Sequence, residues 1–184
     1  MDHYLDIKVL PDPEFAETVL MSALFSKLHR ALVDVGQGQI GVSFPQAGKT
    51  LGNLLRLHGA ASALARLMAE NWLKGLRDYT ETTGVKAIPQ TVQYRLVKRV
   101  QVKSNVERLR RRSVSKGWKT EAEAIETIPL SNEKRSSLPF VQIKSNSTGQ
   151  NFRLFILQEQ IQDVAIEGTF SDYGLSDQAT IPHF

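Results

Sequence analysis

The sequence predicts an α+β protein with a ferredoxin-like first half and a less regular second half. The chain has 184 residues, of which 41% are hydrophobic, enough for one compact domain or two small ones. Over the first half, strand and helix patterns alternate in the order β-α-β-β-α-β, which is typical of ferredoxin-like folds. We place the boundary between the halves at residue 90, beside a proline, which predicts domains over residues 1–90 and 91–184.

The elements of the first half follow from the spacing of apolar residues. Residues 3–10 alternate between apolar and polar side chains, which predicts a half-buried strand. Apolar residues recur at helical spacing over residues 13–35, and Gly36 is well placed to end that helix. The remaining expected elements are strands over residues 40–44 and 51–58, a helix over residues 60–73 and a short strand over residues 76–82.

The second half contains a basic helix between strands. Ser104 and Glu107 have the spacing of a capping box, and Gly117 is a natural end for the helix. At 100° per residue, one face of this helix is rich in guanidinium groups, and Val106, Leu109 and Ser113 lie opposite. The members of the basic face are Arg108, Arg111, Arg112, Ser115 and Lys116. The other expected elements are a strand over residues 91–103, a helix from Thr120, and strands near residues 140–144, 152–157 and 165–170.

Positive charge is concentrated around this helix. Residues 94–119 contain ten basic residues and one acidic residue, a net charge of +9. The whole chain carries +4, so the remainder carries −5. A basic patch on an otherwise acidic protein is typical of a protein that binds a polyanion, because the clustered charges repel one another without a counter-ligand.

Arginine suits phosphate, since its planar fork forms bidentate hydrogen bonds and keeps its charge. An arginine-rich helix fits a DNA major groove or an RNA stem, and charge does not choose between them. Arg99 and Gln101 share one face of the preceding strand, and these residue types can bind guanine and adenine edges. Spacing alone favours the simpler interpretation that both are ordinary exposed strand residues.

Composition argues against several other classes. The absence of cysteine excludes disulfides, thiolate metal sites and cysteine nucleophiles, and is consistent with a reducing, cytoplasmic setting. No run of eighteen apolar residues and no signal-peptide pattern occurs, so we expect no membrane association. The four histidines lack metal-ligand spacing and no glycine-rich phosphate loop is present, so we expect neither a metal nor a cofactor.

Three positions stand out as candidates for chemistry. His29 lies near the end of the first predicted helix and could act as a general base, removing the proton of a ribose 2′-hydroxyl. Ser145 begins a hydroxyl-rich loop, and Phe152 just after it could be a core residue or stack on a base. Tyr173 lies in a predicted turn near the end of the chain. On sequence alone, an exposed helix histidine and ordinary turns explain these positions as well.

Together, several separate motifs resemble a known family, the precursor-crRNA endoribonucleases of type I-F CRISPR systems (Csy4 / Cas6f). The resemblance covers nearly the whole chain, and the run from Lys103 through Arg112 is especially specific. The other matching segments are residues 3–7, 27–29, 40–45, 99–101, 145–150, 152–155 and 173–176. The resemblance implies a sequence- and structure-specific endoribonuclease that cuts the repeat at the base of its hairpin without metal, leaving 5′-hydroxyl and 2′,3′-cyclic phosphate ends.

The resemblance also implies roles for individual residues. His29 would activate the 2′-hydroxyl, Ser145 would hold that hydroxyl and its ribose, and Tyr173 would orient His29. Arg99 and Gln101 would contact the bottom base pairs of the stem, and Phe152 would stack on the terminal pair. The residues expected to bind stem phosphates are Arg108, Arg111, Arg112 and Lys116. The protein would keep its product, act as a monomer on the RNA and join the crRNA-guided surveillance complex.

The chain departs from the family on the basic helix. Lys116 replaces an expected arginine, and Ser115 and Gly117 stand where further basic residues can occur. For each phosphate left unbound as a result, the slope of the logarithm of the binding constant against the logarithm of salt concentration would become shallower by about 0.7 to 0.9. Two alternatives remain at this point. One is a catalytically silent RNA-hairpin-binding subunit. The other is a DNA-binding regulator, which is disfavoured because the sequence shows no helix-turn-helix pairing.

Overall fold

The structure is a computed structural model that describes residues 1–101, 106–128, 136–145 and 149–184. The side chains of residues 107 and 108 also lie outside the described part of the chain. The contacts divide the chain into two compact units, which we describe separately. Unit 1 comprises residues 1–100 and 138–184, and unit 2 comprises residues 101–137. The predicted division at residue 90, which separates halves by expected role, stays a prediction.

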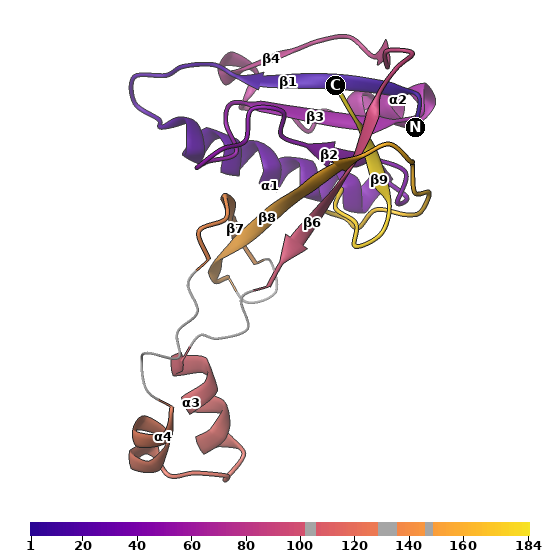
Figure 1. Cartoon of the computed structure of the whole chain (residues 1–184). Coiled ribbons are helices and arrows are strands. Elements are labelled where there is room, and N and C mark those ends of the chain that lie inside the picture. Colours follow the sequence, from indigo (N-terminus) through magenta and orange to yellow (C-terminus); the bar gives the residue numbers. More distant parts are fainter. Residues whose placement is uncertain (102–105, 129–135, 146–148) are drawn as a thin grey trace. The chain divides into compact units, whose positions relative to one another are not determined.

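Unit 1 begins with an antiparallel sheet whose strand order is β2-β3-β1-β4 (Figure 1). Its elements are β1 (His3–Val9), α1 (Glu17–Val35), β2 (Gly41–Ser43), β3 (Leu54–Gly59), α2 (Ala61–Ala69), the 3-10 turn η1 (Arg77–Tyr79), β4 (Thr80–Thr82) and β5 (Lys86–Ala87), which also pairs with β1. The α+β class is confirmed, and the ferredoxin-like assignment stays a prediction. The strand expected over residues 76–82 is correct only at its end, because its first part forms η1.

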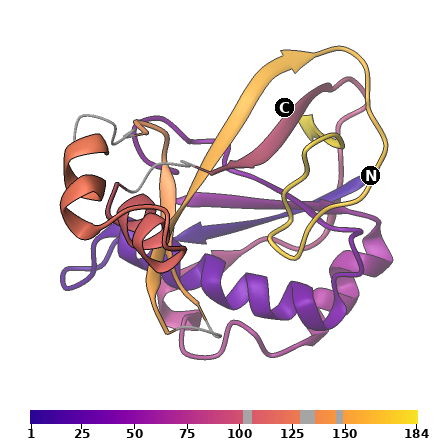
Figure 2. The same ribbon diagram turned by 90° about the horizontal axis from the view of Figure 1, so that it is seen from below.

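Alternation along β1 places its apolar face in the core, as expected. Leu5, Ile7 and Val9 are all buried, whereas Lys8 between them is exposed. Helix α1 covers this sheet and ends at Val35, immediately before Gly36. Its buried residues recur at helical spacing: Leu20, Met21, Leu24, Phe25, Leu28, Ala31 and Leu32. His29 is half-buried and Arg30 is exposed, so both lie outside the buried stripe of the helix. Figure 2 shows α1 from below, as the long helix in the N-terminal colours.

A second antiparallel sheet in unit 1 has the strand order β7-β8-β6-β9. These strands are β6 (Gln93–Val100), β7 (Phe140–Lys144), β8 (Asn151–Gln162) and β9 (Thr180–His183). The expectation of a strand at residues 165–170 was wrong, and β9 was not predicted. Pro182 lowers the strand signal of β9, but an edge strand tolerates a proline because one side of its backbone needs no ladder partner.

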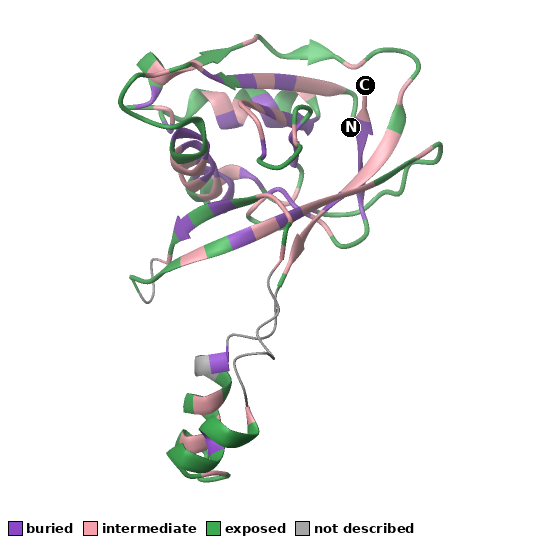
Figure 3. Ribbon diagram, turned by 60° about the vertical axis from the view of Figure 1, so that its left-hand side comes forward, coloured by how far each residue is buried: buried purple, intermediate pink, exposed green. Residues whose placement is uncertain are grey.

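The two sheets and α1 share one hydrophobic core (Figure 3). Polar contacts reinforce this packing at two places. The side chain of Gln158 exchanges two hydrogen bonds with the backbone of Phe44, at 3.0 and 2.9 Å. The backbone nitrogen of Gln142 donates to the Ser22 hydroxyl on α1 at 3.1 Å. Strand β7 is therefore held alongside α1, which brings Ser145, just after the strand, close to the middle of that helix. No helix in the described ranges is long and apolar enough to cross a membrane.

One histidine of the core makes stability depend on pH. His58 is fully buried, and its Nε2 lies 2.8 Å from the Ser43 hydroxyl. Burial lowers the pKa of His58 from 6.5 to about 3, with help from the nearby positive charges of Arg56 and His183. Below pH 6.5 the unfolded chain therefore binds a proton at His58, whereas the folded protein binds it only when the pH approaches 3.

We expect the free energy of unfolding to fall as the pH drops from about 6.5 toward 3, with His58 contributing up to about 1.4 kcal/mol per pH unit. Chemical denaturation of wild type and His58→Gln across this range measures the effect. The other titratable side chains are the same in both proteins, so the difference between the two curves reports on His58 and on its interaction with His183. Parallel curves would contradict the assignment.

Unit 2 is a pair of helices, α3 (Val106–Ser115) and α4 (Glu121–Thr127). Arg110 joins them, since its guanidinium donates to the backbone oxygen of Ile128 at 2.9 and 2.7 Å. Val106 is buried as predicted, but Leu109 is 36% exposed, so the expected inner face is wrong at that position. The Ser104 capping box lies outside the described residues. A capping box does occur at the start of α4, between Thr120 and Glu123.

Candidate active site

His29 is held by two contacts from a distant loop. Its Nδ1 lies 2.8 Å from the backbone oxygen of Asp172. Its ring stacks on that of Tyr173, with the centroids 4.1 Å apart and the planes at 13°. Because a carbonyl oxygen only accepts, Nδ1 must carry the proton, which leaves Nε2 of the neutral ring as an acceptor. No described residue bonds Nε2, so the arrangement prepares this atom to accept a proton from a ligand.

The loop that carries Tyr173 is rigidly built. Gly174 donates to the oxygen of Ser171 at 2.7 Å, and Ser171 donates to that of Leu175 at 2.8 Å. Gly174 has a φ of +68°, and a Cβ there would lie 2.6 Å from a methyl carbon of Val42. Its carbonyl oxygen also accepts a hydrogen bond from the backbone nitrogen of Val42 in β2 at 2.9 Å. The turn therefore packs directly against the first sheet, with no room for a side chain at position 174. The ring of Tyr173 is thereby fixed above α1.

Tyr173 also lies close to a second aromatic ring of α1. Phe25 is parallel to Tyr173 within 4°, at 6.4 Å between centroids. Phe25 and His29 are four residues apart and therefore lie on the same side of the helix. One tyrosine ring thus bridges a core phenylalanine and the half-buried histidine.

A cavity of about 500 Å³ opens beside His29. It brings together four of the predicted site residues: His29, Ser145, Phe152 and Tyr173. Four further lining residues were not predicted: Ser26, Arg30, Ile143 and Lys144. Ser26 precedes His29 by about one helical turn and Lys144 directly precedes Ser145, so their positions beside the candidates were the only signal in the sequence. Arg30 and Lys144 give the cavity a positive charge, which suits a phosphate.

Arg99 of β6 also approaches this group. Its guanidinium carbon lies 5.7 Å from the centre of the Phe152 ring and 5.9 Å from that of Tyr173, within the range of a cation–π contact. Gln101, predicted to act with Arg99, is exposed and belongs to unit 2. Among the residues that the structure describes, no group of three or more histidine, aspartate or glutamate side chains could hold a metal ion.

The basic face of α3 lies in unit 2. Arg111, Arg112 and Lys116 are exposed, whereas Arg110 is engaged with the backbone of α4. The side chain of Arg108 lies outside the described residues. Sequence spacing placed Arg111, Arg112 and Lys116 on the outer face of α3, and all three are exposed. It assigned no role to Arg110, which links α3 to the end of α4.

Comparison with known proteins identifies the class as CRISPR-associated. Residues 4–184 match the family described as CRISPR-associated protein (Cas_Csy4), and the chain belongs to this family.

Two relatives are similar over their full lengths, and both are named CRISPR-associated endonuclease Cas6/Csy4. The one from Escherichia coli (strain UTI89 / UPEC) is 54% identical over 184 residues, and the one from Pseudomonas aeruginosa (strain UCBPP-PA14) is 49% identical over 187 residues. Both alignments cover 100% of this chain and of the relative. A solved structure described as CRISPR endoribonuclease Cse3 bound to 19 nt RNA aligns with a TM-score of 0.38 and 13% identity, over 99% of this chain and 100% of that one.

Proposed function

We propose that this protein is a metal-independent endoribonuclease that cuts precursor CRISPR RNA at the base of the repeat hairpin and keeps the product. The observation that carries the proposal is the orientation of His29, whose Nδ1 is bonded to Asp172 and whose Nε2 is left for a ligand. The endonuclease names of relatives about half identical to this chain support it.

The reaction needs one deprotonation and one in-line displacement. Nε2 of His29 takes the proton of the 2′-hydroxyl next to the scissile phosphate. The 2′-oxygen then forms a bond to phosphorus, the bond from phosphorus to the 5′-oxygen breaks, and the 5′-oxygen takes a proton from solvent. The products are a 2′,3′-cyclic phosphate and a 5′-hydroxyl.

The other cavity residues have matching roles in this proposal. Ser145 holds the 2′-hydroxyl and its ribose, and Phe152 stacks on the terminal base pair. Arg30 and Lys144 stabilise the charge that builds on the non-bridging phosphate oxygens. Tyr173 is a positioning residue that keeps the His29 ring in place.

Recognition of the hairpin falls to the second predicted domain, residues 91–184. Arg99 and Gln101 contact the lowest base pairs. The phosphate-binding residues of the stem are Arg108, Arg111, Arg112 and Lys116. The protein acts in the cytoplasm, as a monomer on its RNA, and carries the product into the crRNA-guided surveillance complex.

A cleavage assay on the repeat RNA in excess EDTA tests the proposal. We expect wild type to cut an all-ribose hairpin in EDTA and to leave intact a hairpin with one 2′-deoxynucleotide at the cut site, because that RNA lacks the nucleophile. Cyclic phosphate ends on the product would identify the chemistry. Tight binding of the all-ribose hairpin without cleavage would show a silent binding subunit instead.

Substitution of Tyr173 tests the positioning role. Tyr173→Ala should slow cleavage by about fivefold, because loss of an aromatic pair costs on the order of 1 kcal/mol. Tyr173→Phe keeps the stacked ring and should restore the wild-type rate. Single-turnover rates at saturating protein measure the effect, and hairpin affinity should be the same in all three proteins. A Phe variant as slow as the Ala variant would assign the role to the hydroxyl instead.

A further inference from the structure

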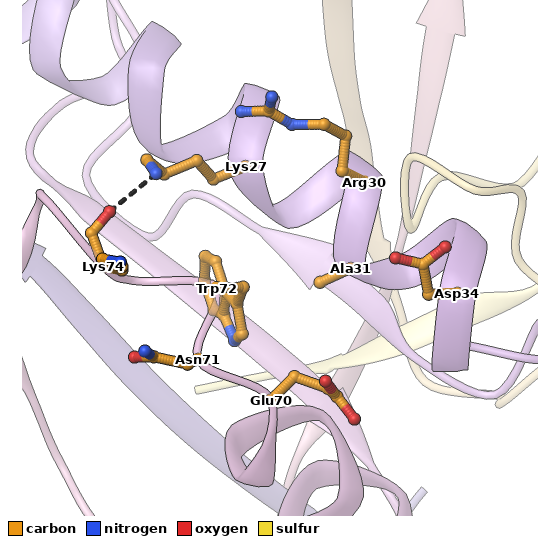
Figure 4. Close-up of a pocket in the computed structure, with 8 residues that line it drawn as sticks. All are labelled: Lys27, Arg30, Ala31, Asp34, Glu70, Asn71, Trp72 and Lys74. Atoms are coloured by element: carbon orange, nitrogen blue, oxygen red, sulfur yellow. Dashed lines mark hydrogen bonds between the residues drawn. The ribbon is translucent and has the colours of Figure 1, made fainter.

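A second cavity, of about 440 Å³, lies between α1 and the segment that follows α2 (Figure 4). Its volume is within the range of roughly 300–1,000 Å³ that is usual for ligand sites. Its charged and aromatic lining residues are Lys27, Arg30 and Asp34 of α1, together with Glu70, Trp72 and Lys74 of the segment after α2. None of them belongs to the group around Tyr173 except Arg30, which lines both cavities.

The cavity is lined by side chains of both charges, which suits a ligand that carries an anionic group and hydrogen-bond donors. In Figure 4, the amines of Lys27 and Lys74 lie to one side of the Trp72 ring, and the carboxylates of Asp34 and Glu70 lie to the other. Lys27 donates one hydrogen bond, to the backbone oxygen of Lys74 at 2.7 Å, which leaves two of its three N–H groups for a ligand.

Trp72 lines this cavity and has a polar atom whose hydrogen-bonding capacity is unused. The residue is only 9% exposed, and its indole nitrogen is buried without a hydrogen-bond partner among the described residues. An unsatisfied buried N–H costs about 1–3 kcal/mol, so a group of this kind calls for an explanation. The nitrogen is closed to solvent in this conformation, so a ligand acceptor would satisfy it once the indole ring turns toward the cavity.

A ribonucleotide has the chemistry that matches these groups. Its phosphate would meet Lys27 and Lys74, and amino groups of its base would meet the carboxylates of Asp34 and Glu70. A ring nitrogen or carbonyl oxygen of the base would accept from Trp72. No purely anionic ligand would tolerate both carboxylates, and an apolar ligand would leave the charged side chains of both signs unmatched.

The shared residue Arg30 indicates which nucleotide is bound. His29 and Arg30 are consecutive on α1, so a strand whose scissile phosphate lies beside His29 passes Arg30 to reach the second cavity. We propose that this cavity binds the unpaired RNA on the 3′ side of the cut, and this proposal rests on the proposed function. The single strand leaving the 5′ end of the stem starts on the other strand of the duplex, away from the scissile phosphate.

Binding of uncleavable hairpins, each with a 2′-deoxynucleotide at the cut site, tests the proposal. One hairpin ends a nucleotide past the cut, one has an unpaired 3′ extension, and one has an unpaired 5′ extension of equal length. We expect the 3′ extension to tighten binding by about tenfold and to steepen the salt dependence by about 0.7 for each phosphate contacted. The 5′ extension should add much less.

Variants of the cavity assign the effect to its residues. Lys27→Ala/Lys74→Ala should remove the gain from the 3′ extension, and Trp72→Phe should reduce it, because phenylalanine lacks the N–H. All variants should bind the hairpin without extension as wild type does. The matched control is Lys49→Ala, which removes an exposed positive charge of unit 1 outside both cavities. Since Lys74 is exposed, Lys74→Ala alone serves if the double variant does not fold.

Three results would overturn the proposal: no gain from the 3′ extension, an equal gain from the 5′ extension, or an equal loss in Lys49→Ala. The first result would leave the cavity to a ligand other than RNA, such as a protein partner. Failure of the proposed function is seen separately, because wild type would then leave the all-ribose hairpin uncut in EDTA whether or not an extension is bound.

Discussion

His29→Ala should lower the rate of hairpin cleavage by about 10²–10⁴-fold, the usual contribution of a general acid or base, while the affinity for the hairpin stays close to wild type. The physical reason is local. The ring is half-buried, it stacks on Tyr173, and its Nδ1 is already committed to the oxygen of Asp172. Removing it deletes the proton acceptor and leaves the helix that carries it intact, because the buried stripe of α1 does not include residue 29.

Two controls make this expectation sharp. His3→Ala removes a histidine of unit 1 that is paired with Asp2, outside the cavity, and should cut as wild type does. Added imidazole should restore part of the activity of His29→Ala, because the empty space beside Tyr173 can take the free ring. Cleavage by His29→Ala at the wild-type rate would end the proposal that this side chain is the base.

The pH dependence separates a base from a positioning group. If Nε2 takes the proton, the pH profile of the single-turnover rate should contain a bend that depends on the side chain at position 29. His29→Gln, which keeps a hydrogen-bonding side chain, should be slow and should lack this bend. A rate that bends in the same way in both proteins would mean that His29 only orients the substrate.

Helix α1 could be predicted from the sequence, whereas the contacts that His29 makes with a distant loop could not. The periodicity of residues 13–35 predicted the helix and most of its buried side, and His29 was not among the apolar positions. Periodicity carries no information about Asp172 and Tyr173, which reach His29 across 143 and 144 residues. Only the family resemblance indicated that Tyr173 and His29 act together, and the structure now places their rings in contact.

The misses have equally local causes. Residues 165–170 contain strand-forming side chains, but tertiary contacts decided their conformation, since Ile166 exchanges hydrogen bonds with Thr180 while β9 takes the ladder position beside β6. On α3, the helical wheel placed Leu109 inside, and Arg110 instead reaches the carbonyls of α4. A wheel counts polarity alone, and it cannot show that a guanidinium is needed at a helix end to satisfy backbone oxygens.

The exposed arginines of α3 should control affinity without controlling chemistry. Arg111→Ala/Arg112→Ala should weaken hairpin binding by about 10- to 100-fold, since each charge-assisted contact to a phosphate contributes on the order of 1 kcal/mol. Both side chains are exposed and neither holds α4, so the helix pair should survive the change. Binding measured across a range of salt concentrations should show a slope shallower by about 0.9 for each duplex phosphate that the variant no longer neutralises.

A matched lysine pair separates charge from geometry. Arg111→Lys/Arg112→Lys keeps both positive charges and should keep the wild-type salt slope, while losing part of the affinity because an ammonium group cannot form the bidentate fork. The alanine pair should still cut at the wild-type single-turnover rate once enough protein is present to saturate the RNA, because the base and the cavity of unit 1 are unchanged. An unchanged salt slope in the alanine pair would mean that these two arginines face solvent in the complex. Stem phosphates would then be bound by other cations of the +9 segment.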